Sequence, residues 1–393
     1  METGQVCDLS DLGSTLILFK LGSGFTRQTS NSQGMTSQTI ASPFSRGFRM
    51  PAEWARHEAT WLTWPHCTET WPDVDLALAA EPAYVAMVEA LRHGETVNVA
   101  VQDADAAHRV AGVLRAAGIA TGAGTAVALR VLPTDDEWIR DYGAVFLTDG
   151  RGGRIATDWI FNAWGSKYDR TERNNTVPQA MAAVHDAERV VMPLVMEGGS
   201  VDVNGAGLVL TTESCLLNPN RNPGLSRQDI EGVLEDGFGA TETIWLGDGI
   251  AGDDTDGHVD DMTRFVAERT VVTAVEPDAG DANHAPLADT LARLHAWRGR
   301  DGQGLRVVTL PMPAPVFHTT PAGAAERLPA SYANFLIANA AVLLPVFDDP
   351  NDAVAIDVMQ GLFPERRIAP VPARSLVWGL GACHCLSQHV PAV

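Results

Sequence analysis

From residue 50 onward the sequence alternates short runs of aliphatic and β-branched residues with longer stretches of helical periodicity. Alternation of this kind is typical of α/β folds, in which helices connect the strands of a sheet. Strands are predicted at residues 97–101, 190–195, 208–212, 271–274 and 307–310. No Pro-, Gly- or Ser-rich linker interrupts residues 49–393, so we expect them to form one compact unit.

The helical stretches carry their own start and stop signals. Apolar residues recur on one face of residues 103–117, and Gly118 is suited to end that helix. A second helix is predicted to begin at Ser226, because Asp229 stands three residues later in a capping-box pattern. Further helices are expected at residues 286–297 and 352–362.

Residues 1–48 differ from the rest of the chain. They are rich in Ser, Thr, Gly and Gln and show little periodicity. We expect them to be a mobile N-terminal tail that carries no chemistry.

The chain is strongly acidic, with 28 Lys and Arg against 49 Asp and Glu and a formal net charge of -21. Such a charge opposes phosphate backbones and anionic lipid, so nucleic acid is excluded as an expected partner. It attracts small cations, although acidity for solubility alone explains it equally well. The longest apolar stretch, residues 335–347, is too short to span a membrane. No secretory signal is recognisable, and the cytoplasm is the expected location.

Five cysteines are sparse and irregularly spaced, which predicts free thiols and no disulfide framework. Small residues precede Cys383 and Cys385, in the segment Gly-Leu-Gly-Ala-Cys-His-Cys. Small residues before a thiol allow a substrate to approach closely, so a nucleophile fits here. The alternative is that both thiols are inert members of the core.

Three other segments could carry chemistry. Residues 253–261 place five carboxylates around His258, but they fit neither a calcium-hand loop nor a zincin motif. A mixed metal site from His258, Asp260 and the carboxyl-terminal Cys and His residues stays open, although no metal is expected. Glu197 begins a Glu-Gly-Gly-Ser segment directly after a predicted strand.

Residues 136–143, Asp-Glu-Trp-Ile-Arg-Asp-Tyr-Gly, alternate acidic and bulky side chains, and an extended segment would place Asp136 and Trp138 on one face. A carboxylate beside an aromatic ring suits a planar guanidinium. The alternative is that Arg140 and Asp141 pair with other charges at a turn.

The spacing of these groups is regular. Asp136 and Glu197 are 61 residues apart, Glu197 and His258 are again 61 apart, and His258 and Cys385 are 127 apart, about twice that interval. Each group could therefore come from the same place in successive units of roughly sixty residues.

Several separated motifs occur together in one order. They are residues 50–65 (MPAEWARHEATWLTWP), 136–143 (DEWIRDYG), 161–169 (FNAWGSKYD), 197–200 (EGGS), 216–223 (LLNPNRNP), 252–266 (GDDTDGHVDDMTRFV), 331–339 (SYANFLIAN) and His384-Cys385. With these motifs the chain resembles the agmatine deiminase family, within the guanidine-modifying enzymes that include bacterial-type peptidyl-arginine deiminases. The resemblance covers about residues 50–391.

The resemblance implies a five-bladed α/β propeller, a pentein fold, whose ββαβ modules surround an axial active-site pocket. It implies that residues 49–393 form a single catalytic domain. It also implies roles for particular residues: Cys385 as nucleophile, His258 as general acid/base, Glu197 as an acid that contacts the substrate or supports the histidine, Asp136 and Asp260 as guanidinium-binding carboxylates beside Trp138, and Gly381 in the wall around the thiol.

The implied reaction is hydrolysis of agmatine to N-carbamoylputrescine and ammonia, in putrescine biosynthesis, with no cofactor and no metal. The partner would be a small cationic guanidine, and a homodimer is compatible with the resemblance. Arginine, peptidyl-arginine and other alkylguanidines remain rival substrates, and a metal-dependent amidohydrolase or a non-catalytic polyamine-binding protein are rival functions. The segment around the thiol departs from the family pattern at Leu380, Ala382, Cys383, Ser387 and His389.

Overall fold

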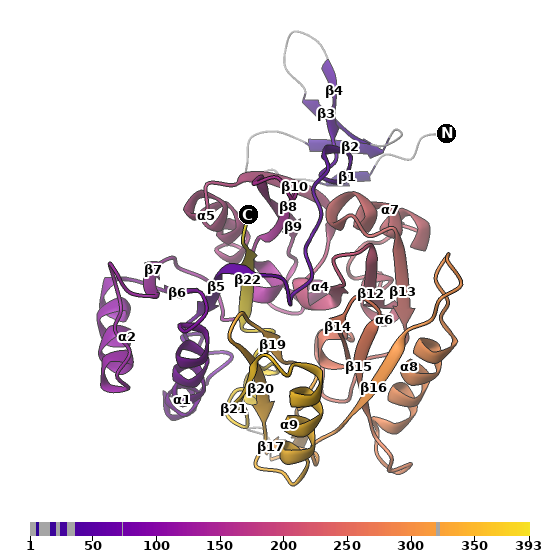
Figure 1. The fold of residues 1–393 in the computed structure, drawn as a ribbon. Coiled ribbons are helices and arrows are strands. Elements are labelled where there is room, and N and C mark those ends of the chain that lie inside the picture. The colour runs from indigo at the N-terminus through magenta and orange to yellow at the C-terminus, as the bar shows by residue number, and fades with distance from the viewer. Residues whose placement is uncertain (1–4, 8–15, 21–23, 30–35, 73, 320–322) are drawn as a thin grey trace.

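The structure is a computed structural model that describes residues 5–7, 16–20, 24–29, 36–72, 74–319 and 323–393. It is a mixed α/β fold, as the alternation of strand and helix patterns predicted (Figure 1). Each of the five strands predicted from the sequence is present, with bounds that differ by no more than two residues.

Five sheets share one arrangement of strands. A first strand pairs antiparallel with a second, and the chain then passes through helical structure to a third strand that is parallel to the second. Four of these sheets are β8 (Val145–Thr148), β9 (Arg154–Ile160) and β10 (Glu188–Val195); β11 (Val201–Val203), β12 (Leu208–Thr212) and β13 (Glu242–Leu246); β14 (Thr263–Ala267), β15 (Thr270–Val275) and β16 (Arg306–Pro311); and β19 (Leu336–Ile337), β20 (Ala341–Val346) and β21 (Arg367–Pro372).

The fifth sheet joins segments from the two ends of residues 49–393. Its first strand is β22 (Ser387–Pro391), which pairs antiparallel with β5 (His57–Thr63), and β6 (Thr96–Val101) and β7 (Val127–Val131) follow in parallel. Figure 1 shows the yellow β22 beside β5. The segment that holds Cys385 is therefore fixed by hydrogen bonds to the start of the same unit.

The helices begin where the sequence signals indicated. The Asp103 side chain accepts a hydrogen bond from the Ala106 amide at the start of α2 (Ala104–Ala116), and Ser226 and Asp229 form a reciprocal capping box on α7 (Arg227–Phe238). The others of two turns or more are α1 (Val74–Leu91), α5 (Val177–Val184), α8 (His284–Ala296) and α9 (Asn351–Leu362). Within the described ranges, none of the helices has both the length and the apolar character needed to cross a membrane.

Two smaller sheets lie outside the five repeats. Strands β17 (Phe317–Thr319) and β18 (Ala325–Arg327) form a hairpin. Strands β1 (Gln5–Cys7), β2 (Leu16–Lys20), β3 (Gly24–Thr29) and β4 (Thr36–Ala41) form a four-stranded antiparallel sheet within the segment expected to be a tail. The mobility of residues 1–48 stays a prediction, but Ser42 is already buried and Phe48 packs against the apolar cluster beneath α7.

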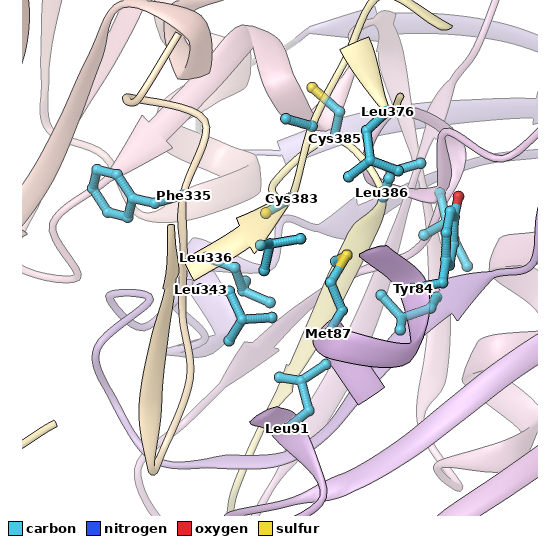
Figure 2. Close-up of a cluster of buried hydrophobic side chains, with 14 of the residues drawn as sticks. Tyr84, Met87, Leu91, Phe335, Leu336, Leu343, Leu376, Cys383, Cys385 and Leu386 are labelled. Carbon is cyan, nitrogen blue, oxygen red and sulfur yellow. The ribbon is translucent and has the colours of Figure 1, made fainter. Parts of the chain in front are cut away.

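The largest apolar cluster extends beneath α1 and α9 and includes strand residues from four of the five repeated sheets. Figure 2 shows part of it, with Cys383 inside the cluster and Cys385 toward its edge. Met87, Leu336 and Leu343 belong to the same cluster and are fully buried. The core thus reaches the backbone that carries the candidate nucleophile, and this backbone is held by packing as well as by β22.

Candidate active site

The residues singled out from the sequence lie at equivalent places in successive sheets. Asp136 and Trp138 precede β8, Glu197 precedes β11, His258 precedes β14, and Cys385 precedes β22. Each residue thus lies in the segment just before the first strand of a sheet. The regular interval of 61 residues between the earlier groups follows from this repetition.

The doubled interval between His258 and Cys385 contains a residue that the sequence analysis missed. Asn334 precedes β19, the first strand of a sheet. Among the five sheets with the repeated arrangement, this is the one for which the sequence analysis named no candidate residue. Its Nδ2 lies 2.9 Å from Cys385 Sγ, and the same Nδ2 donates to Asp261 Oδ1 at 2.8 Å. The doubled spacing was a usable signal that one contributing position remained to be found.

One local prediction is wrong. Residues 136–143 are not extended throughout, because Ile139–Tyr142 form the short helix α3. The Trp138 amide donates to Asp136 Oδ1 at 3.1 Å, and the Gly143 amide donates to the Ile139 carbonyl at 2.9 Å. These local hydrogen bonds close a turn, and the turn carries Asp141 into the site instead of leaving it on an opposite face.

The Cys385 thiol lies in a buried and polar environment. Its Sγ is 3.5 Å from Asp260 Oδ2, in addition to the contact with Asn334. Burial and the charges of Asp260, Asp261 and Asp141 raise the pKa of Cys385 well above its ordinary value. The free Cys385 is therefore a neutral thiol, and it needs a nearby positive charge to ionise.

His384 contacts Asp260, and the sequence analysis assigned no catalytic role to this histidine. His384 Nδ1 lies 2.7 Å from Asp260 Oδ2, and His384 Nε2 lies 2.9 Å from Glu53 Oε2. Glu53 is paired in turn with Arg264 at 2.9 Å. Burial alone would raise the pKa of Asp260, but His384 and the more distant cations lower it, so this carboxylate is ionised.

His258 is buried between two further carboxylates. Its Nε2 is 3.9 Å from Glu197 Oε2 and its Nδ1 is 3.8 Å from Asp141 Oδ1. Burial opposes protonation, but Asp141, Cys215 and Glu197 outweigh it and raise the pKa of His258 well above its ordinary value. The imidazole is therefore cationic at neutral pH and can donate a proton.

Glycine is required beside this histidine. A Cβ built at Gly199 would lie 2.6 Å from His258 Nδ1 and 2.9 Å from Asp141 Oδ1. The Gly199 amide also donates to Asp141 Oδ1 at 2.9 Å. The Glu-Gly-Gly-Ser segment therefore supplies both an acid and the space in which His258 lies.

Glu197 is fixed by Arg221, which lies in the LLNPNRNP motif. Arg221 Nε donates to Glu197 Oε1 at 2.7 Å, and both side chains are buried. Burial raises the pKa of Glu197, but His258 and Arg221 lower it by more, so the acid is ionised. Its other oxygen remains directed at His258 and at the Cys215 thiol, whose Sγ is 4.0 Å away.

Two carboxylate oxygens in the site are buried without a hydrogen-bond partner among the described residues, Asp136 Oδ2 and Asp260 Oδ1. Both ring nitrogens of His258 are also buried without a hydrogen-bond partner among the described residues. Buried polar atoms are normally satisfied, so the group suits a ligand that brings several N–H donors. Burial and Glu137 raise the pKa of Asp136 well above its ordinary value, and a bound cation would reverse that effect.

The wall beside the thiol is formed by Trp138 and Gly381. A Cβ built at Gly381 would lie 2.6 Å from the Trp138 ring and 3.0 Å from Cys385 Cβ. Only a residue without a side chain fits between the indole and the nucleophile. The structure therefore places Trp138, Gly381 and Cys385 together, and their roles stay predictions.

Two sets of side chains could hold a metal ion. Glu197, Cys215 and His258 place one ligand atom each within 4.8 Å of one another, and so do Asp260, Asp261 and Cys385. The carboxylates at 253–256 have protein partners: Asp253 accepts from the His258 amide at 3.0 Å, and Asp256 pairs with Arg221 at 2.5 Å. That a metal is not required stays a prediction.

Comparison with known proteins gives consistent matches over almost the whole chain. A family model described as Porphyromonas-type peptidyl-arginine deiminase matches residues 49–391. An agmatine deiminase of Ectopseudomonas mendocina (strain ymp) is 36% identical over 376 residues, which cover 91% of this chain and 99% of the relative. An agmatine deiminase of Stutzerimonas stutzeri (strain A1501) is 37% identical over 379 residues, with the same coverage.

Solved structures agree with these matches. The agmatine deiminase of Enterococcus faecalis has a TM-score of 0.81 at 30% identity and covers 90% of this chain and 98% of its own. An agmatine deiminase variant of C. jejuni with substrate bound has a TM-score of 0.76 at 29% identity, covering 87% and 96% of the two chains.

The crowding at Gly381 gives a direct test of the wall. We predict that Gly381→Ala lowers kcat/KM on the order of a hundredfold, because the new methyl group must displace the Trp138 ring or the nucleophile. Gly361→Ala is the matched control, since no atom lies within 4 Å of the Cβ it adds. Steady-state kinetics and melting temperatures of both variants check this, and equal activity of the two would refute the assigned wall.

Proposed function

The chain belongs to the Porphyromonas-type peptidyl-arginine deiminase family, and on this premise we propose that it hydrolyses agmatine to N-carbamoylputrescine and ammonia through a covalent thiol intermediate. The observation that carries the proposal is the meeting of a thiol, a cationic imidazole and unpartnered carboxylate oxygens in one buried site. Relatives that match nearly the full chain are named agmatine deiminases.

The guanidinium would be held by Asp136 and Asp260. A guanidinium is planar and permanently charged, and its N–H groups match carboxylate oxygens. Asp136 Oδ2 and Asp260 Oδ1 are such oxygens, and Trp138 offers a ring face beside them. The bound cation would also favour ionisation of Cys385, whose pKa the surrounding carboxylates raise. Because His258 is already cationic, the thiol proton would leave to solvent as the guanidinium binds.

Attack of the Cys385 sulfur on the guanidinium carbon forms a C–S bond and a tetrahedral adduct. Asn334 donates to Sγ and would support the thiolate. His258 would then protonate one nitrogen, and the C–N bond to that nitrogen would break to release ammonia. Glu197 and Asp141, on either side of the ring, favour its cationic form.

Hydrolysis would complete the cycle. The neutral His258 left by ammonia release would take a proton from water, and the resulting hydroxide would attack the thiouronium carbon. Cleavage of the C–S bond then yields the ureido product. It leaves Cys385 as a thiolate and His258 as an imidazolium, the two forms with which the attack began. The chain's own residues perform every step.

The proposal extends to the arrangement of the whole catalytic unit. The five sheets with one strand order would be the five ββαβ blades of a pentein propeller, and the segments before their first strands would surround an axial pocket. We also propose that the protein acts in the cytoplasm, in putrescine biosynthesis, on a small cationic guanidine. A homodimer stays a prediction.

Free arginine is the main rival substrate because it adds a carboxylate. Arg140 and Arg221 were the cations in the motifs that could have clamped it. Arg140 donates to Gln388 Oε1 at 2.8 Å and to the His384 carbonyl at 3.2 Å, while Arg221 is bound to Glu197. Both guanidinium groups therefore bind groups of the protein itself and do not offer a clamp for a substrate carboxylate. This favours agmatine, which has no carboxylate.

We predict that agmatine exceeds arginine in kcat/KM by about tenfold to a thousandfold, the effect of roughly one unpaired charged group. Ammonia and ureido product would be measured with agmatine, arginine and an acylated arginine amide at equal concentrations. Equal or better use of arginine, or activity on the amide alone, would overturn the agmatine assignment.

We predict that Cys385→Ser abolishes turnover, because a hydroxyl at its normal pKa does not attack a guanidinium. Cys383→Ala is the control, since Cys383 lies in the apolar cluster and should leave most activity in place. Activity assays with circular dichroism on both proteins would decide, and the reverse result would reassign the nucleophile.

We predict a bell-shaped dependence of kcat/KM on pH, with its maximum on the alkaline side of neutrality. Attack needs the Cys385 thiolate, so the rate rises with pH, and ammonia release needs the His258 imidazolium, so the rate falls again. Both pKa values are raised, by burial for Cys385 and chiefly by Asp141 for His258. A flat profile between about pH 6 and 10, in a chelator-containing buffer, would contradict the assignment.

A further inference from the structure

A second buried thiol lies beside the proposed acid/base and has no part in the reaction. Cys215 belongs to α6 (Glu213–Leu216), which follows β12, and it is fully buried. Its Sγ lies 4.0 Å from Glu197 Oε2, the oxygen that also faces His258. A thiol, a carboxylate and an imidazole from three separate segments thus meet at one point.

The distances among these atoms are close to those of a metal-bound set. Glu197 Oε2 is 4.0 Å from Cys215 Sγ and 3.9 Å from His258 Nε2, and all three atoms lie within 4.8 Å of one another. Tetrahedral zinc with ordinary bond lengths separates its sulfur, nitrogen and oxygen ligands by about 3.4 to 3.6 Å. The two separations from Glu197 Oε2 exceed these values by about half an ångström, so this side of the set needs only small shifts to accommodate an ion.

An independent observation points to a ligand at this place. Both ring nitrogens of His258 lack a hydrogen-bond partner among the described residues, although only 1% of the residue is exposed. Zinc prefers nitrogen and sulfur donors, and a neutral imidazole offers it a lone pair. His258 Nε2 is directed at the oxygen that Cys215 shares.

The second candidate set, Asp260, Asp261 and Cys385, is less suited to a soft ion. Asp260 Oδ2 already lies 2.7 Å from His384 Nδ1, and Asp261 Oδ1 accepts from Asn334 at 2.8 Å. This set also lacks an imidazole. A thiophilic ion therefore gains more from the set that includes Cys215.

We propose that Glu197, Cys215 and His258 form an inhibitory site for a thiophilic divalent cation such as Zn²⁺. Binding would form a metal–sulfur bond and a metal–nitrogen bond and would release two protons to water, one from the Cys215 thiol and one from the His258 imidazolium, while Glu197 supplies a carboxylate oxygen. A metal on Nε2 occupies the lone pair of that nitrogen, so His258 can no longer form the imidazolium that would protonate the departing ammonia. Binding itself is independent of the proposed function, and only the inhibition rests on it.

Cobalt gives a readout that needs no catalysis, because thiolate bound to Co²⁺ produces a charge-transfer band in the near ultraviolet. The experiment uses full-length Cys385→Ser protein, so that the competing set has lost its thiol. We expect the band on Co²⁺ addition, loss of the band in Cys385→Ser/Cys215→Ser, and its retention in the matched control Cys385→Ser/Cys383→Ala. A band that survives in Cys385→Ser/Cys215→Ser, or none in Cys385→Ser, would overturn the site.

The inhibition is tested separately. Zn²⁺ should inhibit wild-type turnover of agmatine, and EDTA should restore it. Cys215→Ser, normalised to its own metal-free rate, should require at least about tenfold more Zn²⁺ for half inhibition. Equal sensitivity of the two proteins would overturn the inhibitory role. An absence of turnover without metal would count against the proposed function, while the cobalt band would still decide the binding site.

Discussion

The candidate site depends on a chain of buried charges that begins at Glu53. Glu53 binds Arg264 and His384, and His384 holds Asp260, whose second oxygen is left for a ligand. These groups come from the first and last parts of the catalytic unit and from β14. Removal of Glu53 would deprive the buried Arg264 guanidinium of one of its two carboxylate partners, which is costly. The arrangement therefore fixes both the geometry and the ionisation of the site.

Each sheet contributes to the site from the same place, the segment before its first strand. This repetition lets five segments that are distant in sequence supply a carboxylate, an acid, an imidazole, an amide and a thiol to one region. The resulting environment is dominated by carboxylates, and a buried excess of negative charge raises the free energy of the site until a cation enters. Selectivity for guanidinium follows from the same charges that hold the free thiol in its neutral form.

Two cysteines that are two residues apart show how strongly surroundings decide chemistry. Cys383 lies in the apolar cluster, and burial alone raises its pKa. The pKa of Cys385 is raised by burial together with Asp260, Asp261 and Asp141, and Asn334 opposes the shift. A cation in the site can offset the carboxylate charges that help raise the pKa of Cys385. The pKa of Cys383 is raised by burial, which a cation in the site does not change. The first thiol is therefore a core residue and the second can be activated.

The sequence by itself determined the α/β class, the caps at Asp103 and Ser226, and the interval that related Asp136, Glu197 and His258, because periodicity, capping and repeat spacing are local properties of a chain. It misassigned residues 139–142, where a single helical turn is too short to show a period. Only the tertiary structure paired His384 with Glu53, placed Asn334 on Cys385 Sγ, and brought Cys215 to Glu197. Glu53 and His384 precede the paired strands β5 and β22, Glu197 and Cys215 flank the paired strands β11 and β12, and Asn334 and Cys385 precede strands of different sheets. Strand pairing and sheet packing decide these contacts, and neither is a local property of the sequence.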